Sequence, residues 1–310
     1  MNPLNHYLSR RKALKHLAVG AACLSLPQWS LGQTEKMTKR SIPSSGEKIG
    51  SVGLGTWQTF DVGGATAARE PLKEVLKVLI ANGGTVVDSS PMYGSSEQVV
   101  GDLATELGMV DKLFFATKVW TTGEKSGTEQ MKRSMSRMQA QPMDLMQVHN
   151  LQDWKTHLRT LYDWKEKGLI RYIGITHYLD TAHDQLERII KTEAIDFLQV
   201  NYSIIDRNAE KSLLPTALDK GVAVLTNRPY AGGSLFRKTS GKQVPAWAEG
   251  FDCKSWGQFF LKYLLANPAI TCVIPGTSKP HHMLDNVGAG MGRLPDEVEK
   301  KKMLELIRSI

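Results

Sequence analysis

Cysteine is scarce in this sequence, and its scarcity narrows the class of protein. Three cysteines occur among 310 residues, so no framework of disulfides can hold the fold, and Cys253 and Cys272 are expected to be buried as small apolar residues. A run of about 20 apolar residues, the length of a membrane-spanning helix, is also missing. Hydrophobic residues make up 41% and charged residues 23%, which is ordinary for a globular enzyme with one large core.

Acidic residues are absent from the first 34 positions, where four basic residues stand unopposed: Arg10, Arg11, Lys12 and Lys15. A modest apolar run over residues 17–27 follows, and then Ser30-Leu31-Gly32. This order of charged, apolar and small residues is typical of a secretory leader. The paired arginines resemble the twin-arginine type, although Ala13 stands where that motif usually carries Phe.

We therefore expect residues 1–32 to be a signal peptide read by the twin-arginine export machinery, and residues 33–310 to be a domain that works in the periplasm or is otherwise exported. An ordinary amphipathic helix at the N-terminus is the alternative. Loss of the leader would lower the formal net charge from +8 to +4. The other basic residues are scattered, and their densest run, at residues 300–302, fits a solvated helix face. No nucleic-acid partner and no stable membrane span are expected.

Short β-branched and aromatic runs alternate with amphipathic helical segments after about residue 40, which indicates parallel strands joined by helices. The candidate strands number eight, at residues 51–55, 85–88, 113–118, 143–149, 172–176, 197–201, 223–227 and 271–275. Helices are expected near residues 68–82, 96–107, 128–140, 153–167, 180–191, 208–220 and 254–266, and from about residue 296.

Eight such units close most economically into a single (β/α)8 TIM barrel, which places its chemistry at the C-terminal ends of the strands. A doubly wound sheet would need G-x-G-x-x-G after its first strand, and Gly53-Leu54-Gly55 is followed instead by Thr56 and Trp57. Turn-forming residues at 40–47 predict an N-terminal hairpin that closes the barrel floor. The sequence makes no prediction of oligomeric state.

Ionisable residues stand at, or just after, the ends of three neighbouring strands: Asp88, Tyr93, Lys118 and His149. A charged group there is costly to desolvate unless it is paired, so Asp88 and Lys118 are predicted to form an ion pair. The ammonium is expected to favour the phenolate of Tyr93 and to lower its pKa from about 10, which makes that phenol a candidate general acid. Taken singly, these residues would also fit a core ion pair, a rim aromatic and a core histidine.

At this point the sequence resembles the aldo/keto reductases, over about residues 40–290. The matching fragments are Gly53-Leu54-Gly55-Thr56-Trp57, Val87-Asp88-Ser89-Ser90-Pro91-Met92-Tyr93-Gly94, Ala116-Thr117-Lys118, Gln147-Val148-His149-Asn150, Gly174-Ile175-Thr176-His177 and Ile274-Pro275-Gly276-Thr277. The resemblance implies a catalytic tetrad of Asp88, Tyr93, Lys118 and His149. In the implied reaction, nicotinamide C4 delivers hydride to an aldehyde or ketone and Tyr93 protonates the oxygen, while Lys118 polarises Tyr93 and a neutral His149 orients the carbonyl.

The resemblance also implies the cofactor, NADPH with NADH held open, and its contacts. The residues carried over are Thr56, Trp57, Asp88, Thr176, His177, Gln199, Asn227, Arg228, Pro229, Thr277, Ser278, Lys279, His282, Asp285 and Asn286. Five positions depart from the family pattern. Thr176-His177 replaces a Ser-Asn pair, Asn227 replaces a Tyr that stacks on the nicotinamide ring, and Gly276 and His282 stand where many relatives carry the Lys and Arg that bind the 2′-phosphate.

The sequence as a whole predicts an NAD(P)H-dependent oxidoreductase that acts on a small carbonyl substrate at an aromatic-walled pocket formed by Trp57, Trp120 and Tyr93. Two alternatives are an NADP(H)-binding sensor or partner subunit with little turnover, and a barrel lyase or isomerase that needs no nicotinamide. No metal site is expected, because His281 and His282 are predicted to point apart on a helix and no Cys or carboxylate pair completes a site.

Overall fold

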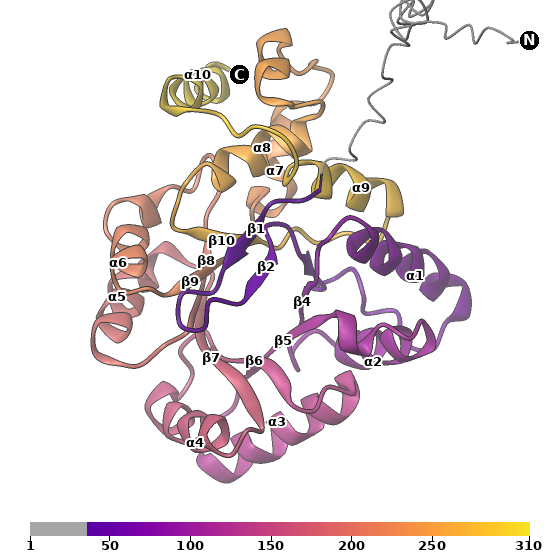
Figure 1. Ribbon diagram of the computed structural model, residues 1–310, viewed down its shortest axis with the longest axis vertical. Helices are drawn as coiled ribbons and strands as arrows, with labels where there is room; N and C mark the ends of the chain where they lie inside the picture. The colour runs from indigo at the N-terminus through magenta and orange to yellow at the C-terminus, as the bar shows by residue number, and fades with distance from the viewer. Residues whose placement is uncertain (1–35) are drawn as a thin grey trace, which may run out of the picture. The chain divides into compact units, whose positions relative to one another are not determined.

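Parallel strands form a central barrel, each followed by a helical segment on the outside (Figure 1). The computed structural model describes residues 36–310, so the predicted signal peptide lies outside the described residues. The sheet runs in chain order through eight strands, namely β3 (Leu54–Gly55), β4 (Val86–Asp88), β5 (Phe114–Val119), β6 (Met143–His149), β7 (Ile170–His177), β8 (Phe197–Asn201), β9 (Ala223–Asn227) and β10 (Ile270–Val273). The predicted (β/α)8 barrel is confirmed.

The first and last strands of the sheet close the barrel. Parallel bridges join Val52 to Val273 and Gly55 to Gly276, and the Gly53 amide donates to the Val273 carbonyl at 2.8 Å. A Cβ on Gly55 would lie 2.8 Å from the backbone oxygen of Ile274. Glycine is therefore required where these two strands approach.

Helices cover the outside of the barrel, at α1 (Thr66–Ala81), α2 (Ser96–Glu106), α3 (Glu124–Met138), α4 (Trp154–Glu166), α5 (His183–Thr192), α6 (Leu213–Asp219), α7 (Ser234–Lys238), α8 (Trp256–Leu265), α9 (Pro280–Gly288) and α10 (Glu297–Ser309). Short 3-10 helices occupy Val110–Lys112, Asp180–Ala182, Asn208–Glu210, Ala231–Gly233 and Ala246–Phe251. Two of these displace the predicted starts of α5 and α6 by a few residues.

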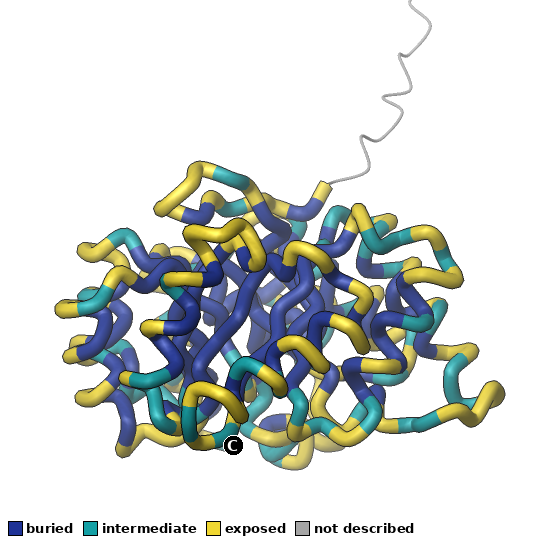
Figure 2. Tube along the Cα trace, turned by 90° about the horizontal axis from the view of Figure 1, so that it is seen from below, coloured by how far each residue is buried: buried dark blue, intermediate teal, exposed yellow. Residues whose placement is uncertain are grey.

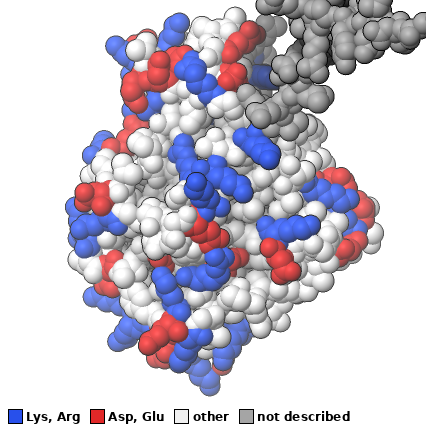
Figure 3. Space-filling view, viewed as in Figure 1, with Lys and Arg blue, Asp and Glu red and all other residues white. Residues whose placement is uncertain are grey.

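The longer outer helices bury an apolar stripe. In α1 the buried residues are Leu72, Val75, Leu76 and Leu79, the spacing that one face of a helix requires. Figure 2 shows the buried strands enclosed by helices whose outer surfaces are exposed. Between residues 36 and 310, no helix has the length and apolar character needed to cross a membrane. On the face seen in Figure 3, positive and negative side chains are intermixed.

A separate antiparallel hairpin, β1 (Lys39–Ser41) and β2 (Lys48–Gly50), covers the N-terminal end of the barrel as predicted. Its Ile42 and Ile49 are buried and belong to the apolar cluster inside the barrel. Arg40 anchors the hairpin, because its guanidinium donates to the backbone oxygens of Leu265 and Ile270.

The interior of the barrel changes from apolar to polar along the strands. Alternate residues of a strand point to the same side, and the inward positions near the floor carry apolar side chains, including Phe114, Leu145, Phe197 and Cys272. Two or four residues further along the strands, these inward positions carry Lys118, Gln147, His149 and Gln199. The alternation that fills the barrel floor therefore also delivers polar groups to its C-terminal end. Cys253 and Cys272 are free and buried, as expected.

Candidate active site

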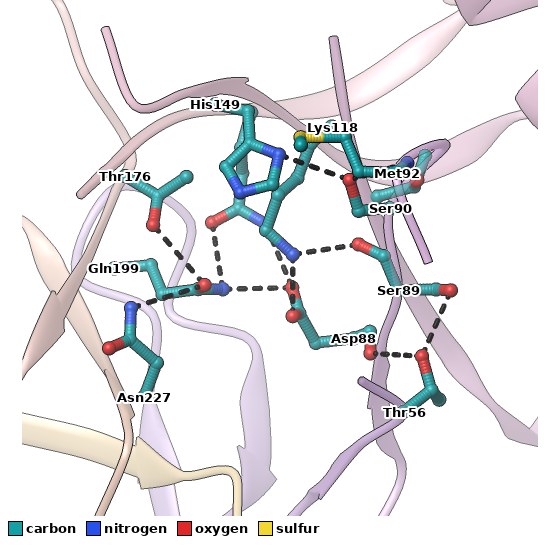
Figure 4. A network of polar contacts seen from close by, with 12 residues as sticks. Thr56, Asp88, Ser89, Ser90, Met92, Lys118, His149, Thr176, Gln199 and Asn227 are labelled. Atoms are coloured by element: carbon teal, nitrogen blue, oxygen red, sulfur yellow. Dashed lines mark hydrogen bonds and ion pairs between the residues drawn. The ribbon is translucent and has the colours of Figure 1, made fainter. Parts of the chain in front are cut away.

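A buried ion pair between Asp88 and Lys118 lies at the centre of the site (Figure 4). Lys118 Nζ is 2.6 Å from Asp88 Oδ2, and the two side chains are 0% and 4% exposed. The ammonium also donates to the Ser89 backbone oxygen at 2.7 Å. Burial lowers the pKa of Lys118. The charges of Asp88 and Tyr93, together with their hydrogen bonds, raise that pKa by more than burial lowers it, so the net pKa is above its ordinary value. The predicted ion pair is confirmed, and Lys118 remains charged.

Tyr93 lies beside this pair, with Lys118 Nζ 5.1 Å from the centre of its ring. The predicted direction of its pKa shift was wrong. Burial raises the pKa of Tyr93, Lys118 lowers it and Asp88 raises it, and the net pKa is above 10. Asp88 cancels part of the field of Lys118, so the desolvation of the phenolate dominates. The phenol is therefore fully protonated at neutral pH.

His149 ends β6 next to Tyr93, with the two rings edge to face and their centres 6.0 Å apart. Burial, followed by the charges of Lys118 and His177, lowers the pKa of His149 to about 3. The imidazole is therefore neutral, as predicted. Its Nδ1 is 3.0 Å from Ser90 Oγ, which also accepts from the Met92 amide at 3.3 Å. This serine was not predicted to contribute to the site.

Two glutamines complete the surroundings of Asp88. Its Oδ1 accepts from Gln199 Nε2 at 2.8 Å and from Gln147 Nε2 at 3.0 Å, and Gln199 Nε2 also lies 3.3 Å from Gln147 Oε1. Gln147 was missed by sequence reasoning. A polar residue two positions before His149, on the same face of the strand as the apolar Met143 and Leu145, was the available signal.

The ends of β7, β8 and β9 bring together Thr176, Gln199 and Asn227. Gln199 Oε1 accepts from Thr176 Oγ1 at 3.2 Å and lies 3.5 Å from Asn227 Nδ2. Asn227 Oδ1 is buried and has no hydrogen-bond partner in the described part of the chain. A buried acceptor of this kind is uncommon and usually marks a place where a ligand or water belongs.

His177 and Arg228 lie at the rim of this region, and both lie close to the ring of Tyr178. The His177 ring stacks on Tyr178 with centres 5.6 Å apart, and the Arg228 guanidinium lies 5.8 Å from the centre of the Tyr178 ring. Pro229 is buried next to Arg228. The guanidinium of Arg228 thus already has an aromatic ring as a neighbour.

The first barrel strand contributes Thr56 and Trp57. The Thr56 hydroxyl is buried, 3.1 Å from the Asp88 backbone oxygen and 2.9 Å from Ser89 Oγ. Trp57 is 52% exposed, and Trp120, after β5, is 41% exposed. Thr56 therefore braces the Asp88 loop, whereas the two tryptophans stand at the open end of the barrel.

The segment after β10 holds the remaining predicted contacts. Thr277 Oγ1 accepts from the Lys279 amide at 3.1 Å, next to the partly exposed Ser278, and the side chains of Lys279 and His282 are exposed. Asp285 accepts from Ser255 and Gln258, and Asn286 Oδ1 accepts from the Tyr230 hydroxyl at 2.5 Å. Asp285 and Asn286 are therefore engaged within the protein.

The prediction that His281 and His282 point apart was wrong. Their rings pack edge to face with centres 4.3 Å apart, because both side chains in the first turn of α9 rotate toward one another. Over residues 36–310, no group of three or more His, Cys, Asp or Glu side chains is arranged to hold a metal ion.

An eight-stranded α/β barrel with a lysine, a carboxylate, a phenol and an imidazole clustered at its strand ends has the architecture of a barrel enzyme. The profile of the aldo/keto reductase family matches residues 51–302. The chain belongs to the aldo/keto reductase family, as its motifs predicted.

Individual relatives have low sequence identity to this chain, but they match it over most of its length. Aldo-keto reductase YhdN of Bacillus subtilis is 27% identical over 245 residues, which cover 73% of this chain and 71% of that protein. The L-galactose dehydrogenase of Arabidopsis thaliana is 27% identical over 283 residues, covering 82% and 88%. The crystal structure of an aldo/keto reductase from Klebsiella pneumoniae, in complex with NADP and acetate, has a TM-score of 0.73 at 23% identity and covers 88% of this chain and 95% of its own.

Substitution of Lys118 by Met is expected to destabilise the protein by about 3–5 kcal/mol, because it leaves a carboxylate buried without its counter-charge. Adding Asp88→Asn removes that charge and should restore part of the loss. Thermal unfolding of the single and double variants measures both effects. If the double variant is less stable than Lys118→Met alone, the uncompensated carboxylate is not the cause.

His149 is expected to make the protein sensitive to acid. Its pKa is about 3 in the folded state and about 6.5 in the unfolded chain, so below pH 6.5 only the unfolded state takes up the proton. The stability contributed by the neutral ring is complete above that pH and declines as the pH falls towards 3. The melting temperature of His149→Gln should therefore fall less steeply than that of the unaltered protein over this range, and parallel curves would contradict the shift.

Proposed function

We propose that this protein is an NADPH-dependent reductase of aldehydes or ketones, with NADH as the less favoured cofactor. The observation that carries the proposal is the cluster of Asp88, Tyr93, Lys118 and His149 at the C-terminal end of the barrel. The same four residues were predicted from the family motifs, and the chain's family membership rests independently on a match over residues 51–302.

The residues at the strand ends fit a nicotinamide cofactor, which would supply the hydride. The carboxamide of nicotinamide carries both N–H donors and a carbonyl acceptor, and Asn227 Oδ1 is a buried acceptor without a donor among the described residues. Thr176 and Gln199 lie next to Asn227, so the three side chains would hold the carboxamide. Asn227 thus offers a hydrogen bond where relatives offer a stacking ring.

The start of α9 supports a phosphorylated cofactor. Backbone N–H groups at a helix N-terminus and the helix dipole favour an anion, and the exposed side chains of Lys279 and His282 add positive or hydrogen-bonding groups. The Klebsiella pneumoniae neighbour, whose barrel superimposes on this one, is in complex with NADP. We therefore favour NADPH.

Tyr93 would protonate the oxygen of the substrate as negative charge develops there. Its raised pKa keeps the proton in place until it is needed, and a phenol remains a stronger acid than the alcohol that is formed, so the transfer is downhill. Lys118 stabilises the phenolate that results. Asp88 keeps that ammonium in position, 2.6 Å from the carboxylate.

His149 would orient the carbonyl by donating a hydrogen bond. Ser90 Oγ already accepts from the Met92 amide, so its own proton is available for His149 Nδ1. A neutral ring that accepts at Nδ1 carries its proton on Nε2. The side chain therefore presents a donor to a carbonyl oxygen without bringing a positive charge that would compete with Lys118.

The open end of the barrel favours a substrate with apolar surface. Trp57, Met92 and Trp120 follow three successive strands there, and each is more than 40% exposed. Large exposed apolar side chains gathered at one place mark a binding surface more often than chance. An aldehyde or ketone of modest size with an apolar body fits this mouth.

Tyr93→Phe is expected to abolish turnover and to leave cofactor binding nearly unchanged, because only the transferable proton is lost. Turnover is followed by the loss of dihydronicotinamide absorbance with a panel of aldehydes and ketones, and binding by NADPH fluorescence. Tyr162→Phe is the matched control, since Tyr162 hydrogen-bonds Glu193 away from the site. Undiminished turnover by the Tyr93 variant would rule out this phenol as the acid.

We also propose that residues 1–32 are a twin-arginine signal peptide and that the barrel domain from residue 33 works outside the cytoplasm, in the periplasm. The paired Arg10 and Arg11, followed by an apolar run and Ser30-Leu31-Gly32, support this proposal. The twin-arginine machinery exports proteins that have already folded. A nicotinamide cofactor bound in the cytoplasm would therefore be exported together with the enzyme. The proposed leader and the proposed cofactor are therefore compatible.

Replacing Arg10 and Arg11 together by lysine keeps the charge and changes only what an export receptor reads. The variant is expected to accumulate in the cytoplasm, as measured by fractionation of cells that have the twin-arginine machinery. Replacing Lys12 and Lys15 by arginine is the matched control and should leave export intact. Equal export of the twin-lysine variant and the unaltered protein would refute the assignment.

A further inference from the structure

The structure assigns a role to Gln147, which lies in a fragment that matches the family but belongs neither to the implied tetrad and cofactor contacts nor to the proposed mechanism. Gln147 is fully buried and contacts both Asp88 of the catalytic cluster and Gln199 of the candidate carboxamide site. We propose that Gln147 is a positioning residue that fixes the orientation of the Gln199 amide and so couples cofactor binding to the Asp88–Lys118 pair. This inference rests on the proposed function, because it assumes a nicotinamide carboxamide next to Gln199.

The Asp88 carboxylate orients both glutamine side chains. An ionised carboxylate can only accept hydrogen bonds, and Asp88 Oδ1 lies within 3.0 Å of both glutamine side chains. Both glutamines must therefore turn their amino groups toward Asp88. The amide oxygen of Gln147 is then free to accept the second N–H of Gln199, at 3.3 Å.

The orientation of Gln199 follows from these two contacts. Its amino group is held by Asp88 Oδ1 and Gln147 Oε1 together, so its carbonyl oxygen must face the opposite way, toward Thr176 and Asn227. That oxygen is the group that a carboxamide N–H would meet. Gln147 thus determines whether Gln199 presents an acceptor or a donor to the cofactor.

The neighbouring strand makes room for this arrangement. Gln147 on β6 is in register with Gly174 on β7, and a Cβ at position 174 would lie 2.8 Å from Gln147 Cγ. Any larger residue there would displace the glutamine from Asp88. The absence of a side chain at Gly174 therefore leaves the space in which the Gln147 side chain reaches Asp88.

The role is tested with two substitutions and NADP⁺ as the binding probe. Gln147→Met keeps the length of the side chain and removes both hydrogen bonds, so NADP⁺ should bind about three- to tenfold more weakly, the worth of one neutral hydrogen bond. Asp88 would lose a donor and exert a stronger field on Tyr93. The basic limb of the pH profile of kcat/KM should therefore move to higher pH.

Gln147→Glu is the second substitution, and it tests the role of Gln147 on its own if the methionine variant does not fold. A protonated glutamic acid can donate its O–H to Asp88 and accept from Gln199 with its carbonyl oxygen, the two contacts that Gln147 makes, whereas the ionised form repels Asp88. Titrations of this variant should show near-normal NADP⁺ affinity in acidic buffer and progressive weakening as the new carboxyl group ionises. The unaltered protein, measured beside it, should not show this weakening.

Thr117→Val is the matched control. Thr117 lies on the adjacent strand β5, is fully buried, and donates to Glu97 at 2.6 Å on the outer side of the barrel. Its loss should lower the melting temperature and leave both NADP⁺ affinity and the pH profile unchanged.

The two proposals can fail separately. Lack of NADP⁺ and NADPH binding by the unaltered protein would overturn the proposed function and, with it, the role of Gln147. Normal binding by the unaltered protein, combined with unchanged affinity and pH profile in Gln147→Met or a pH-independent affinity in Gln147→Glu, would overturn the role of Gln147 alone.

Discussion

The polar end of the barrel is arranged around one buried ammonium, that of Lys118, whose charge must be neutralised. Lys118 is fully buried, and an isolated charge in that position would cost several kcal/mol. Asp88 supplies the counter-charge at 2.6 Å, and the Ser89 carbonyl takes a second ammonium hydrogen bond. Asp88 then needs donors for its other oxygen, which Gln147 and Gln199 provide. Asp88 thus compensates for the desolvation of Lys118, and the two glutamines compensate for the desolvation of Asp88.

The same arrangement explains why the phenol of Tyr93 keeps its proton. A lone ammonium next to Tyr93 would favour the phenolate, but Asp88 cancels much of that field, and burial then keeps the pKa of Tyr93 above its ordinary value. The neutral His149 adds no charge of its own. Positive charge is held close to the phenol without being strong enough to remove its proton, which in the proposed function would pass to the substrate oxygen.

The sequence predicted the fold and the four central residues because both depend on local patterns. Strand and helix periodicity repeats eight times, and Asp88, Tyr93, Lys118 and His149 stand at recognisable strand ends in a known family order. The direction of the Tyr93 pKa shift was predicted wrongly, because it results from burial and two opposed charges whose distances no pattern encodes. The contact between His281 and His282 was missed because the spacing of two adjacent helical residues does not fix the rotation of their exposed side chains.

Gln147 shows most clearly what sequence patterns leave out. Its neighbours in the chain are apolar strand residues, and its importance appears only when Asp88, Gln199 and Gly174, from three other strands, are brought around it. The same holds for Asn227, whose side-chain oxygen has no partner among residues 36–310 and lies beside Gln199. A stacking ring acts through shape and tolerates either orientation of a carboxamide. In the proposed function, Asn227 and the oriented Gln199 would instead discriminate between the donor and the acceptor of the carboxamide, which the stacking Tyr of the family pattern would not do.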